Sequence, residues 1–505
     1  MKEIKRALIS VYNKEGIEEM AKILSTNGIE ILSTGGTYDF LVEKSIPVIK
    51  VEDITGYPSI LGGRVKTLHP KIFGGILSRR DNNKDITEIA KFDIPEIDLV
   101  IVDLYPFKEY VKANASHKEI IEKIDIGGIS LIRAAAKNYS DVVIIPSKEM
   151  YAPFLNILKT NGPKTTIEER EFFAAYAFAV SSEYDTAIFN YLNKKSEIVA
   201  FKESILTSRS LRYGENPHQK GFYFGEENSL PKQLHGKEIS HNNLLDIEAA
   251  IELISDFSEP TVAIIKHTNA CGCACANTIK EAWEKALEAD PVSAFGGIII
   301  ANRNIDIDAA ELINKIFFEV IIAPSYSNDA LNLLESKKNR IILENNGVTP
   351  TDKKFRSLLG GVLLQERDAY KESSDDLKCV TLKKPEDNKI DDLLFANILV
   401  KHSKSNAIVL AKNKQLIASG VGQTSRVDAL KQAIEKAKSF KLDLNGAVMS
   451  SDAFFPFPDC VEIAAKEGIK TVIQPGGSVR DQESIDWCNN NDVAMVLTGI
   501  RHFKH

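Results

Sequence analysis

Apolar and polar residues alternate along the first 150 positions in a way that predicts strands and helices in turn. Short apolar runs, typical of buried strands, occur at 6–11, 29–32, 98–104 and 142–145. Between the first two runs, Ile17, Met20 and Leu24 recur at helical spacing, and Gly28 is placed to end that helix. Further helices are expected at 37–44, 117–124 and 128–138. Strands that alternate with helices favour a parallel sheet with helices on its faces.

A second region repeats this alternation after a polar, weakly patterned stretch at 194–210. Just before that stretch a long helix is expected at 165–193, with an apolar face of Phe172, Phe173, Tyr176, Ala177 and Val180. Strands are then expected at 261–266, 297–301, 320–323, 407–411, 470–474 and 493–497, and helices at 278–289, 307–319 and 427–438. The polar stretch 371–391 is expected to be a surface excursion. We therefore predict an α/β protein with domains 1–197 and 198–505, the second large enough for two subdomains.

Two segments of the second region indicate an internal duplication. DPVSAFGG at 290–297 and SSDAFFPF at 450–457 each place Ala-Phe next to a strand-like run. The similarity is short, so it suggests a repeat without establishing one.

Charge and composition exclude several classes of protein. The 505 residues carry 63 Lys+Arg and 70 Asp+Glu, a formal net charge of −7, which argues against a general nucleic-acid binder. No apolar run approaches the roughly 18 residues that a membrane span requires. The N-terminus has no apolar segment of the kind found in signal peptides, so we expect a cytoplasmic protein without membrane or nucleic-acid partners.

Three of the six cysteines crowd into CGCAC at 271–275. Their spacing is not the Cys-x2-Cys spacing of ordinary zinc sites, and a disulfide framework is not expected in a chain this long. We expect reduced structural thiols, with a metal or redox role as the alternative.

Two strand ends of the first region have the composition of phosphate sites. The first strand runs into SVYNK at 10–14, and the second into STGGT at 33–37 before a helix. Hydroxyls, glycine amides and a helix N-terminus can surround an anion, and open α/β sheets bind ligands at the carboxyl ends of their strands. A Gly-Gly pair in such a turn can equally serve the geometry of the turn alone.

Three further segments carry candidate chemistry. GGRVKTLHP at 62–70 places two cations in a glycine-rich loop, LYPF follows the buried strand at 104–107, and Asp125 opens a helix that includes Lys137. Each has a plainer interpretation, because exposed cations are usually solvated and an Asp before a Gly pair can be an N-cap.

The first region resembles the IMP cyclohydrolase domain of the bifunctional phosphoribosylaminoimidazolecarboxamide formyltransferase / IMP cyclohydrolase family. The segments that carry this resemblance are SVYNKEG, STGGT, GGRVKTLHP, DLYPF and DIGGISLIRAAAKN. The resemblance implies a methylglyoxal-synthase-like fold. It implies a nucleotide phosphate held by Ser10, Lys14, Ser33, Thr34, Gly35, Gly36 and Thr37. It places around the base Arg64, Lys66, Thr67, Tyr105, Asp125, Gly127, Gly128 and Lys137. The family has Asn where this chain has Asp103, and an ionised acid accepts but does not donate a hydrogen bond, which puts the Asp103 contact in doubt.

The reaction implied for this domain is a dehydrative ring closure within one molecule. We expect Asp125 to take the proton of the attacking carboxamide nitrogen and Lys66 to stabilise the formyl oxygen. Tyr105 and Lys137 are expected to assist proton transfer or to orient the carboxamide.

In the second region, Lys266 and His267 directly follow a strand, where an α/β fold places ligands, although a lone His is more often structural. The segments that resemble the formyltransferase domain of the same family are LRYGENPHQ, IKHTNACG, DPVSAFGG, KSNAIVLAK, GQTSRVDA, SSDAFFPF, IQPGGSVRDQE and TGIRHFKH. The resemblance implies a duplicated cytidine-deaminase-like fold without the catalytic zinc, 10-formyltetrahydrofolate as co-substrate, and a homodimer. His267 is then expected to deprotonate the substrate amine and Lys266 to assist the oxyanion or leaving nitrogen. The substrate-binding residues implied are Arg212, Tyr213, Asn406, Arg426, Phe454 and Arg501, with Asp459 as a folate-site candidate beside the departure Pro458.

Two other functions are weighed against this one. A nucleotide-sensing module joined to a transferase would need the phosphate loop but not Lys66, Tyr105, Asp125 and Lys137 together. A zinc nucleoside deaminase would need His-x-Glu followed by Pro-Cys-x-x-Cys, which the chain lacks.

Overall fold

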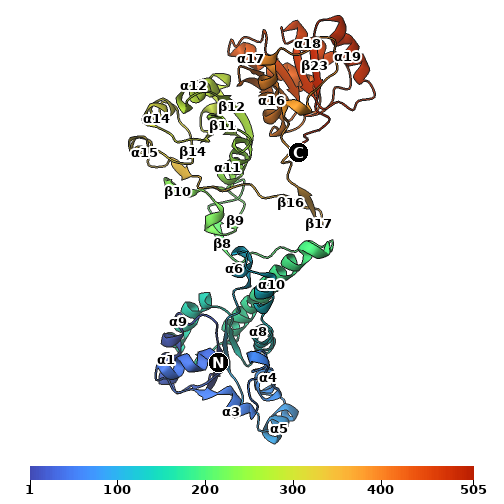
Figure 1. The fold of residues 1–505 in the computed structure, drawn as a ribbon. Helices are drawn as coiled ribbons and strands as arrows, with labels where there is room; N and C mark the ends of the chain where they lie inside the picture. The colour runs from blue at the N-terminus through green and yellow to red at the C-terminus, as the bar shows by residue number, and fades with distance from the viewer. The chain divides into compact units, whose positions relative to one another are not determined.

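The computed structural model describes residues 1–505 and separates into two compact units, Met1–Leu206 and Thr207–His505 (Figure 1). Each unit has its own sheet and its own hydrophobic core. None of the helices combines the length and the apolar character that crossing a bilayer requires.

The first unit is built on a five-stranded sheet whose strands all run parallel. Its order is β4 (Ile49–Lys50), β3 (Glu30–Ser33), β2 (Arg6–Ser10), β5 (Leu99–Val102) and β6 (Val143–Ile145). All four residues of β5 are buried, as expected of a strand covered on both faces. The parallel sheet predicted from the alternating pattern is therefore confirmed. A separate two-stranded pair joins β1 (Lys2–Glu3) to β7 (Lys164–Thr165).

Most helices of the first unit pack apolar side chains against this sheet. Their bounds are α1 (Ile17–Thr26), α2 (Gly35–Glu43), α3 (Val51–Thr55), α4 (Pro70–Leu77), α5 (Asn83–Lys91), α6 (Phe107–Lys112), α7 (His117–Glu122), α8 (Gly127–Lys137), α9 (Tyr151–Asn161) and α10 (Ile167–Ser196), with short 3₁₀ turns η1 (Leu61–Gly63) and η2 (Lys148–Met150). The expected apolar face of α10 is partly wrong: Phe173 and Ala177 are buried, but the Phe172 side chain is 55% exposed. Neighbouring residues on a helix point about 100° apart, so two adjacent phenylalanines do not share one narrow face.

The second unit is built on a twelve-stranded mixed sheet with the order β10-β15-β14-β13-β11-β12-β20-β19-β21-β22-β23-β18. Strands of its first half are β10 (Lys232–His235), β11 (Thr261–Lys266), β12 (Asn269–Cys275), β13 (Ile298–Ala301), β14 (Val320–Ala323) and β15 (Ile341–Glu344). Those of its second half are β18 (Lys378–Cys379), β19 (Ile408–Lys412), β20 (Gln415–Gly420), β21 (Val448–Ser451), β22 (Thr471–Gln474) and β23 (Ala494–Leu497).

The two halves of this sheet repeat one topology, drawn green to yellow and then orange to red in Figure 1. In the first, β11 pairs antiparallel with β12 and β13, and β13, β14 and β15 run parallel. In the second, β19 pairs antiparallel with β20 and β21, and β21, β22 and β23 run parallel. The predicted duplication is thus present. The Ala-Phe motifs do not occupy equivalent positions in the two repeats. Ala294-Phe295 precedes β13, whereas Ala453-Phe454 follows β21, the strand equivalent to β13.

Most helices of the second unit have a counterpart in the other repeat. Their bounds are α11 (His241–Ile254), α12 (Ile279–Ala289), α13 (Pro291–Ala294), α14 (Ile307–Ile313), α15 (Asn328–Glu335), α16 (Asp387–Lys401), α17 (Arg426–Ser439), α18 (Asp459–Lys466) and α19 (Asp481–Asn490), with 3₁₀ turns η3 (Glu227–Ser229) and η4 (Ser374–Asp376). One core contains residues of α11, α16 and the central strands of both repeats, including Ile247, Ile265, Leu399 and Val409. The repeats therefore share a hydrophobic core.

Two expectations for this unit are wrong in detail. The helix expected at 307–319 ends at Ile313, since the chain must turn there to enter β14. The polar stretch 371–391 is not a mere surface excursion: Glu372 is buried and β18 pairs with β23. Two hairpins complete the unit, β8 (Ser208–Leu211) with β9 (Gly221–Phe224) and β16 (Lys353–Leu358) with β17 (Gly361–Glu366).

The CGCAC run forms most of strand β12. Its three cysteines are buried and all six in the chain are free thiols. Burial raises the pKa of the Cys271 thiol to about 12, which keeps it protonated and unreactive at neutral pH. These thiols pack in the core on both sides of the sheet.

Candidate active sites

A cavity of about 640 Å³ opens at the carboxyl ends of β2, β3 and β5 in the first unit. This is the edge at which parallel sheets bind ligands. The residues expected in the site that line it are Ser10, Lys14, Thr34, Gly36, Thr37, Arg64, Lys66, Thr67, Asp103, Tyr105, Asp125, Gly127 and Gly128. Segments separated by more than 100 residues thus converge on one cavity.

A corner suited to an anion lies where β3 runs into α2. The helix begins at Gly35 and no side chain caps its N-terminus, so its first amides are free to bind a ligand. Lys14 lies beside it, with its ammonium 3.2 Å from the Thr37 hydroxyl. Burial lowers the pKa of Lys14, nearby Asp103 opposes that shift, and Lys66 adds to it. Two cations facing an uncapped helix start suit a phosphate.

Two glycines make room for the Lys66 side chain. A Cβ on Gly35 would lie 2.9 Å from the Lys66 Nζ, and one on Gly63 would lie 2.7 Å from its Cε. Both glycines have positive φ angles, 54° and 90°, which side chains disfavour. Gly35 and Gly63 therefore form the slot that brings Lys66 to the start of α2, beyond shaping the turns.

Asp103, where the family has Asn, accepts two backbone hydrogen bonds and donates none. One carboxylate oxygen accepts from the Tyr12 backbone N–H, and the other accepts from the Asn13 N–H at 2.9 Å. Burial raises the pKa of Asp103, and these backbone hydrogen bonds oppose the rise. An ionised acid satisfies both donors, so Asp103 holds the 11–14 loop without needing to donate.

Asp125 combines a capping role with a place in the cavity. Its Oδ1 accepts from the Gly128 N–H at 2.6 Å at the start of α8, and its backbone N–H donates to the Tyr184 hydroxyl at 2.9 Å. A Cβ on Gly128 would lie 2.8 Å from the Asp125 carboxylate, so glycine is needed there. Burial raises the pKa of Asp125. A carboxylate with a raised pKa beside an anion site is suited to general base catalysis.

Three expected residues do not line this cavity. The Ser33 side chain is buried and donates to the Ile9 carbonyl at 2.7 Å, which joins β3 to β2. Lys137 is exposed in the last turn of α8, about 15 Å along the helix from Gly127. Gly35 is also absent from the lining but contacts Lys66.

Residues that the sequence analysis did not single out lie in the cavity lining, as Tyr12 and Glu122 do, or beside it, as Lys123 does. Arg64 forms an ion pair with Glu122. The Lys123 ammonium lies over the rings of Tyr12, Tyr105 and Tyr110, 4.6 to 5.6 Å from their centroids. Tyr12 lies inside the SVYNK motif, so its position in the sequence was a usable signal.

In the second unit, Lys266 and His267 lie at the two-residue turn between β11 and β12. His267 and Thr268 have φ angles of 49° and 64°, the left-handed pair of a type I′ hairpin. The Thr268 N–H donates to Asp246 of α11 at 2.6 Å, and the Lys266 ammonium donates to the Phe295 carbonyl at 3.0 Å. The turn is thus tied to a helix, and both side chains come from a rigid element.

The second repeat has an equivalent turn without the histidine. Asn413 and Lys414 also have positive φ angles, and the Lys414 N–H donates to Asp392 of α16 at 2.7 Å. Lys412, the counterpart of Lys266, is bound to Asp443 and to the Asn445 carbonyl, each at 2.8 Å. The duplicated fold therefore carries one turn with Lys and His and one locked by ion pairs.

A buried network joins three of the expected substrate residues. Arg426 donates to the Asn406 side chain at 3.0 Å, to Asp452 at 2.8 Å and to the Phe454 carbonyl at 3.3 Å. Asp452, fully buried, is the hub that the sequence analysis missed. The Lys404 N–H donates to the Asn269 side chain at 2.9 Å, which connects this network to the 266–269 turn.

The other expected residues of the second unit lie on separate segments. Arg212 donates to the Tyr213 hydroxyl at 2.8 Å, on the exposed loop after β8. Asp459 is the first residue of α18 and accepts from the Cys460 N–H. No contact between these residues and Lys266 or Arg426 is seen in the chain.

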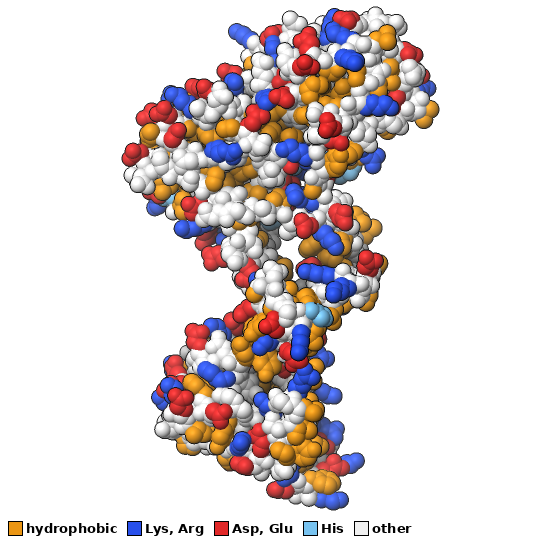
Figure 2. Space-filling model, in the orientation of Figure 1, with side chains coloured by type: hydrophobic (Ala, Val, Ile, Leu, Met, Phe, Trp, Pro, Cys, Tyr) orange, Lys and Arg blue, Asp and Glu red, His pale blue; other side chains and the backbone are white.

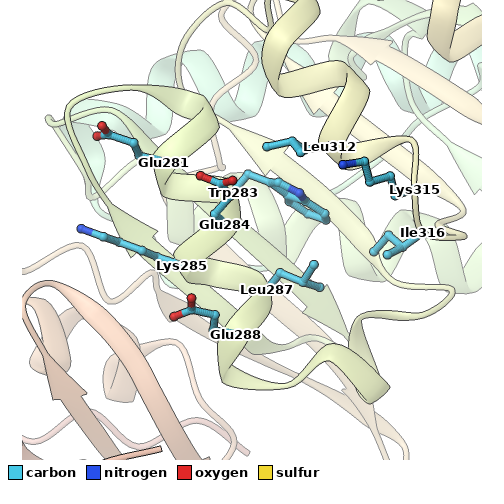
Figure 3. Close-up of a pocket in the computed structure, with 9 residues that line it drawn as sticks. All are labelled: Glu281, Trp283, Glu284, Lys285, Leu287, Glu288, Leu312, Lys315 and Ile316. Carbon is cyan, nitrogen blue, oxygen red and sulfur yellow. The ribbon is translucent and has the colours of Figure 1, made fainter.

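A further cavity, of about 480 Å³, lies between α12 and the end of α14 (Figure 3). Trp283 and Leu287 face Leu312 and Ile316 across it. It contains none of the residues expected to carry chemistry.

Comparisons with known proteins identify the family of this chain. The family described as AICARFT/IMPCHase bienzyme matches residues 135–436, and an MGS-like domain matches residues 16–130. The chain is 62% identical over 504 residues to the bifunctional purine biosynthesis protein PurH of Bacteroides thetaiotaomicron, covering 100% of this chain and 99% of that protein. The proteins of the same description from Acetivibrio thermocellus and Aquifex aeolicus are 50% and 49% identical, each covering 99% of this chain and 100% of its relative.

A solved structure described as "Crystal structure of ForH" is 33% identical, covers 37% of this chain and 99% of its own, and has a TM-score of 0.33. The family is assigned by the 62% identity over the full chain and by a family model that spans more than half of the chain. The chain belongs to the AICARFT/IMPCHase bienzyme family, the bifunctional formyltransferases and cyclohydrolases of purine biosynthesis.

Proposed function

We propose that the two activities of this family are divided between the two units. The first unit, which contains the predicted domain 1–197, closes the ring of the formamido nucleotide to give inosine monophosphate. The second, which contains most of the predicted domain 198–505, transfers the formyl group from 10-formyltetrahydrofolate to the aminoimidazole carboxamide ribonucleotide. The observation that carries this proposal is the pair of separate sites, the 640 Å³ cavity with Lys66 and Asp125 and the Lys266-His267 turn.

For ring closure, the nucleotide phosphate binds at the α2 N-terminus beside Lys14. The carboxamide nitrogen attacks the formyl carbon, and Asp125 takes the proton that the nitrogen loses. Lys66 stabilises the negative charge on the formyl oxygen. That oxygen leaves as water once it has gained two protons, the one that Asp125 took and the one that the formamide nitrogen releases. Tyr105, at the cavity rim, orients the carboxamide. Holding both reacting arms in one closed geometry supplies much of the rate.

For formyl transfer, the substrate amine attacks the formyl carbon of the folate. His267 takes the amine proton while Lys266 stabilises the oxyanion and helps protonate the folate nitrogen that leaves. The new C–N bond forms first and gives a tetrahedral oxyanion, whose collapse breaks the C–N bond to the folate, so atoms and charge balance without a redox partner. Arg212, Arg426 and Arg501 are proposed to bind substrate anions, because a guanidinium can donate two parallel hydrogen bonds to a phosphate or carboxylate.

We further propose that the protein acts as a homodimer. The β16–β17 hairpin exposes apolar side chains, with Leu359 fully exposed and Leu363 56% exposed. Apolar side chains are also visible on the surface of the second unit (Figure 2). An exposed two-stranded hairpin with such residues is marginal alone and is stabilised by pairing with another chain.

The test is to supply the aminoimidazole ribonucleotide with 10-formyltetrahydrofolate and to follow inosine monophosphate by absorbance. His267→Ala is expected to abolish formyl transfer while cyclisation of added formylated nucleotide continues. Asn413→Ala is the matched control, because it changes the equivalent turn of the second repeat at a similar positive φ. Loss of both activities in His267→Ala, or an equal loss in Asn413→Ala, would argue against the proposed division.

A further inference from the structure

The last six residues form a tail without regular secondary structure, and Arg501 lies on it. Exposure alternates along the tail: Arg501 and Phe503 face solvent, whereas His502 is 2% exposed. The Arg501 guanidinium lies over the Phe503 ring, 4.4 Å from its centroid. Contacts made by the inward residues therefore decide where the outward guanidinium sits.

His502 is held between two carboxylates from one distant segment. Its Nδ1 lies 2.6 Å from Asp368 and its Nε2 lies 2.7 Å from Glu372, which is itself buried. Ionised carboxylates only accept hydrogen bonds, so both ring nitrogens donate and the ring is an imidazolium. A further charged group near the clamp is Lys401, whose ammonium binds Asp256 and the Tyr370 carbonyl. The clamp fixes both the position and the rotation of the ring.

The same stretch of tail is bonded to the substrate network. The His502 N–H donates to the Asp452 carbonyl at 3.0 Å, and the Lys504 N–H donates to the Ser405 hydroxyl at 3.0 Å. Ser405 in turn donates to the Asp452 carboxylate at 2.6 Å, which also binds Arg426. A shift of His502 would thus move its neighbour Arg501 and disturb the hydrogen bonds at Asp452.

We infer that His502, clamped by Asp368 and Glu372, is a positioning residue that orients Arg501 toward the nucleotide in the formyltransferase site. This inference rests on the proposed role of Arg501 in substrate binding. His502 itself touches no substrate, and its effect is carried by the backbone of the tail. The clamp also ties the segment that follows the β16–β17 hairpin to the site.

The test measures kcat and KM for the aminoimidazole ribonucleotide in formyl transfer by His502→Leu, Arg501→Ala and the double variant. His502→Leu is expected to raise KM about tenfold, with a much smaller change in kcat, because the guanidinium is misplaced but present. In the Arg501→Ala background, His502→Leu is expected to cause no further rise. His235→Leu, which changes a partly exposed histidine of the edge strand β10, is the control and is expected to leave KM unchanged.

The outcomes separate this inference from the proposed function. An unchanged KM in His502→Leu beside a raised KM in Arg501→Ala would overturn the positioning role and leave the substrate role of Arg501 intact. Additive effects in the double variant would also overturn it, because His502 would then act elsewhere. An unchanged KM in Arg501→Ala would instead refute the substrate role. Circular dichroism and thermal unfolding of the purified variants report the folding of the second unit. His502→Gln, which keeps one donor and is expected to restore part of the affinity, replaces His502→Leu if that variant does not fold.

Discussion

At the scale of single residues, both proposed catalytic lysines lie against a glycine. Gly35 and Gly63 make room for Lys66, and a Cβ on Gly296 would lie 3.2 Å from the Lys266 ammonium. A long cation close to the backbone is restricted in its rotamers, which keeps its charge at one place. The acidic partner in the first unit, Asp125, is likewise held by backbone donors.

The first prediction concerns Asp125 as a base. Asp125→Asn is expected to slow cyclisation by roughly 10²- to 10⁴-fold while formyl transfer is unchanged. A base acts when ionised, and burial raises its pKa, so cyclisation should fall on acidification at a higher pH than an ordinary aspartate would give. The pH profile of kcat/KM for the formylated nucleotide measures this. An acid limb at the pH of a solvated aspartate would contradict the assignment.

The second prediction concerns the slot for Lys66. Gly63→Ala is expected to reduce cyclisation strongly, because its Cβ would meet the Lys66 Cε at 2.7 Å. Gly28→Ala has a similar positive φ, 73°, with nothing within 4 Å, so it carries the backbone strain of about 1 kcal/mol without the clash. Steady-state cyclisation rates of the two variants, compared at equal thermal stability, measure the difference. Equal losses in both would show that strain alone matters.

At the scale of elements, the second unit shows how one topology can carry two different turns. The β11–β12 and β19–β20 hairpins share a type I′ turn anchored to an aspartate on the preceding helix, Asp246 or Asp392. Their tips differ, with a histidine in one and ion-paired lysines in the other. The tail that contains His502 differs from these hairpins. It is held mainly by side-chain hydrogen bonds and not by a series of hydrogen bonds between strands.

The third prediction follows from the His502 clamp. Its two carboxylates, Asp368 and Glu372, raise the pKa of His502 to about 9 against the opposing effect of burial. A raised pKa stabilises the fold below the unfolded value near 6.5, and this contribution of order 3 kcal/mol disappears as the pH rises through 9. The free energy of unfolding of the wild type should exceed that of His502→Leu at pH 6 and converge with it above pH 9. A pH-independent difference would contradict a charged clamp.

At the scale of the whole molecule, the β16–β17 hairpin is the exposed feature that a single chain does not explain. Its register is regular from Lys353 opposite Glu366 to Leu358 opposite Gly361, yet it presents apolar side chains to solvent. The clamp residues Asp368 and Glu372 follow it closely in sequence, so a short stretch of chain joins the proposed dimer contact to the proposed formyltransferase site.

The fourth prediction tests that arrangement. Leu363→Asp is expected to lower the solution mass from about twice the 56.0 kDa of one chain to that of one chain, because it places a charge in an apolar contact. Formyl transfer should fall with dimer content while cyclisation persists. Analytical ultracentrifugation with both assays measures this. Ile86→Asp, which changes an exposed apolar residue of α5, is the control. A wild-type protein that sediments as one chain would contradict the dimer.

The linear pattern determined the parallel sheet of the first unit and most strand positions, since periodicity follows from which faces are buried. It also located the segments of the first cavity, because a strand's carboxyl end is a local feature and parallel strands bring such ends to one edge. What it left open were relations between distant residues: that Phe173 rather than Phe172 packs inward, and that Asp103 is an acceptor.

Tertiary structure alone decided the remaining features. The partners of His502 lie 130 and 134 residues away, and the repeat of β11–β15 in β19–β23 is visible in strand order rather than in shared motifs. Burial and hydrogen bonding between segments far apart in the chain depend on how the sheets close and pack. Local periodicity does not indicate which distant segments pack together. The His502 clamp, the duplicated turn and the exposed hairpin could therefore be identified only in the folded chain.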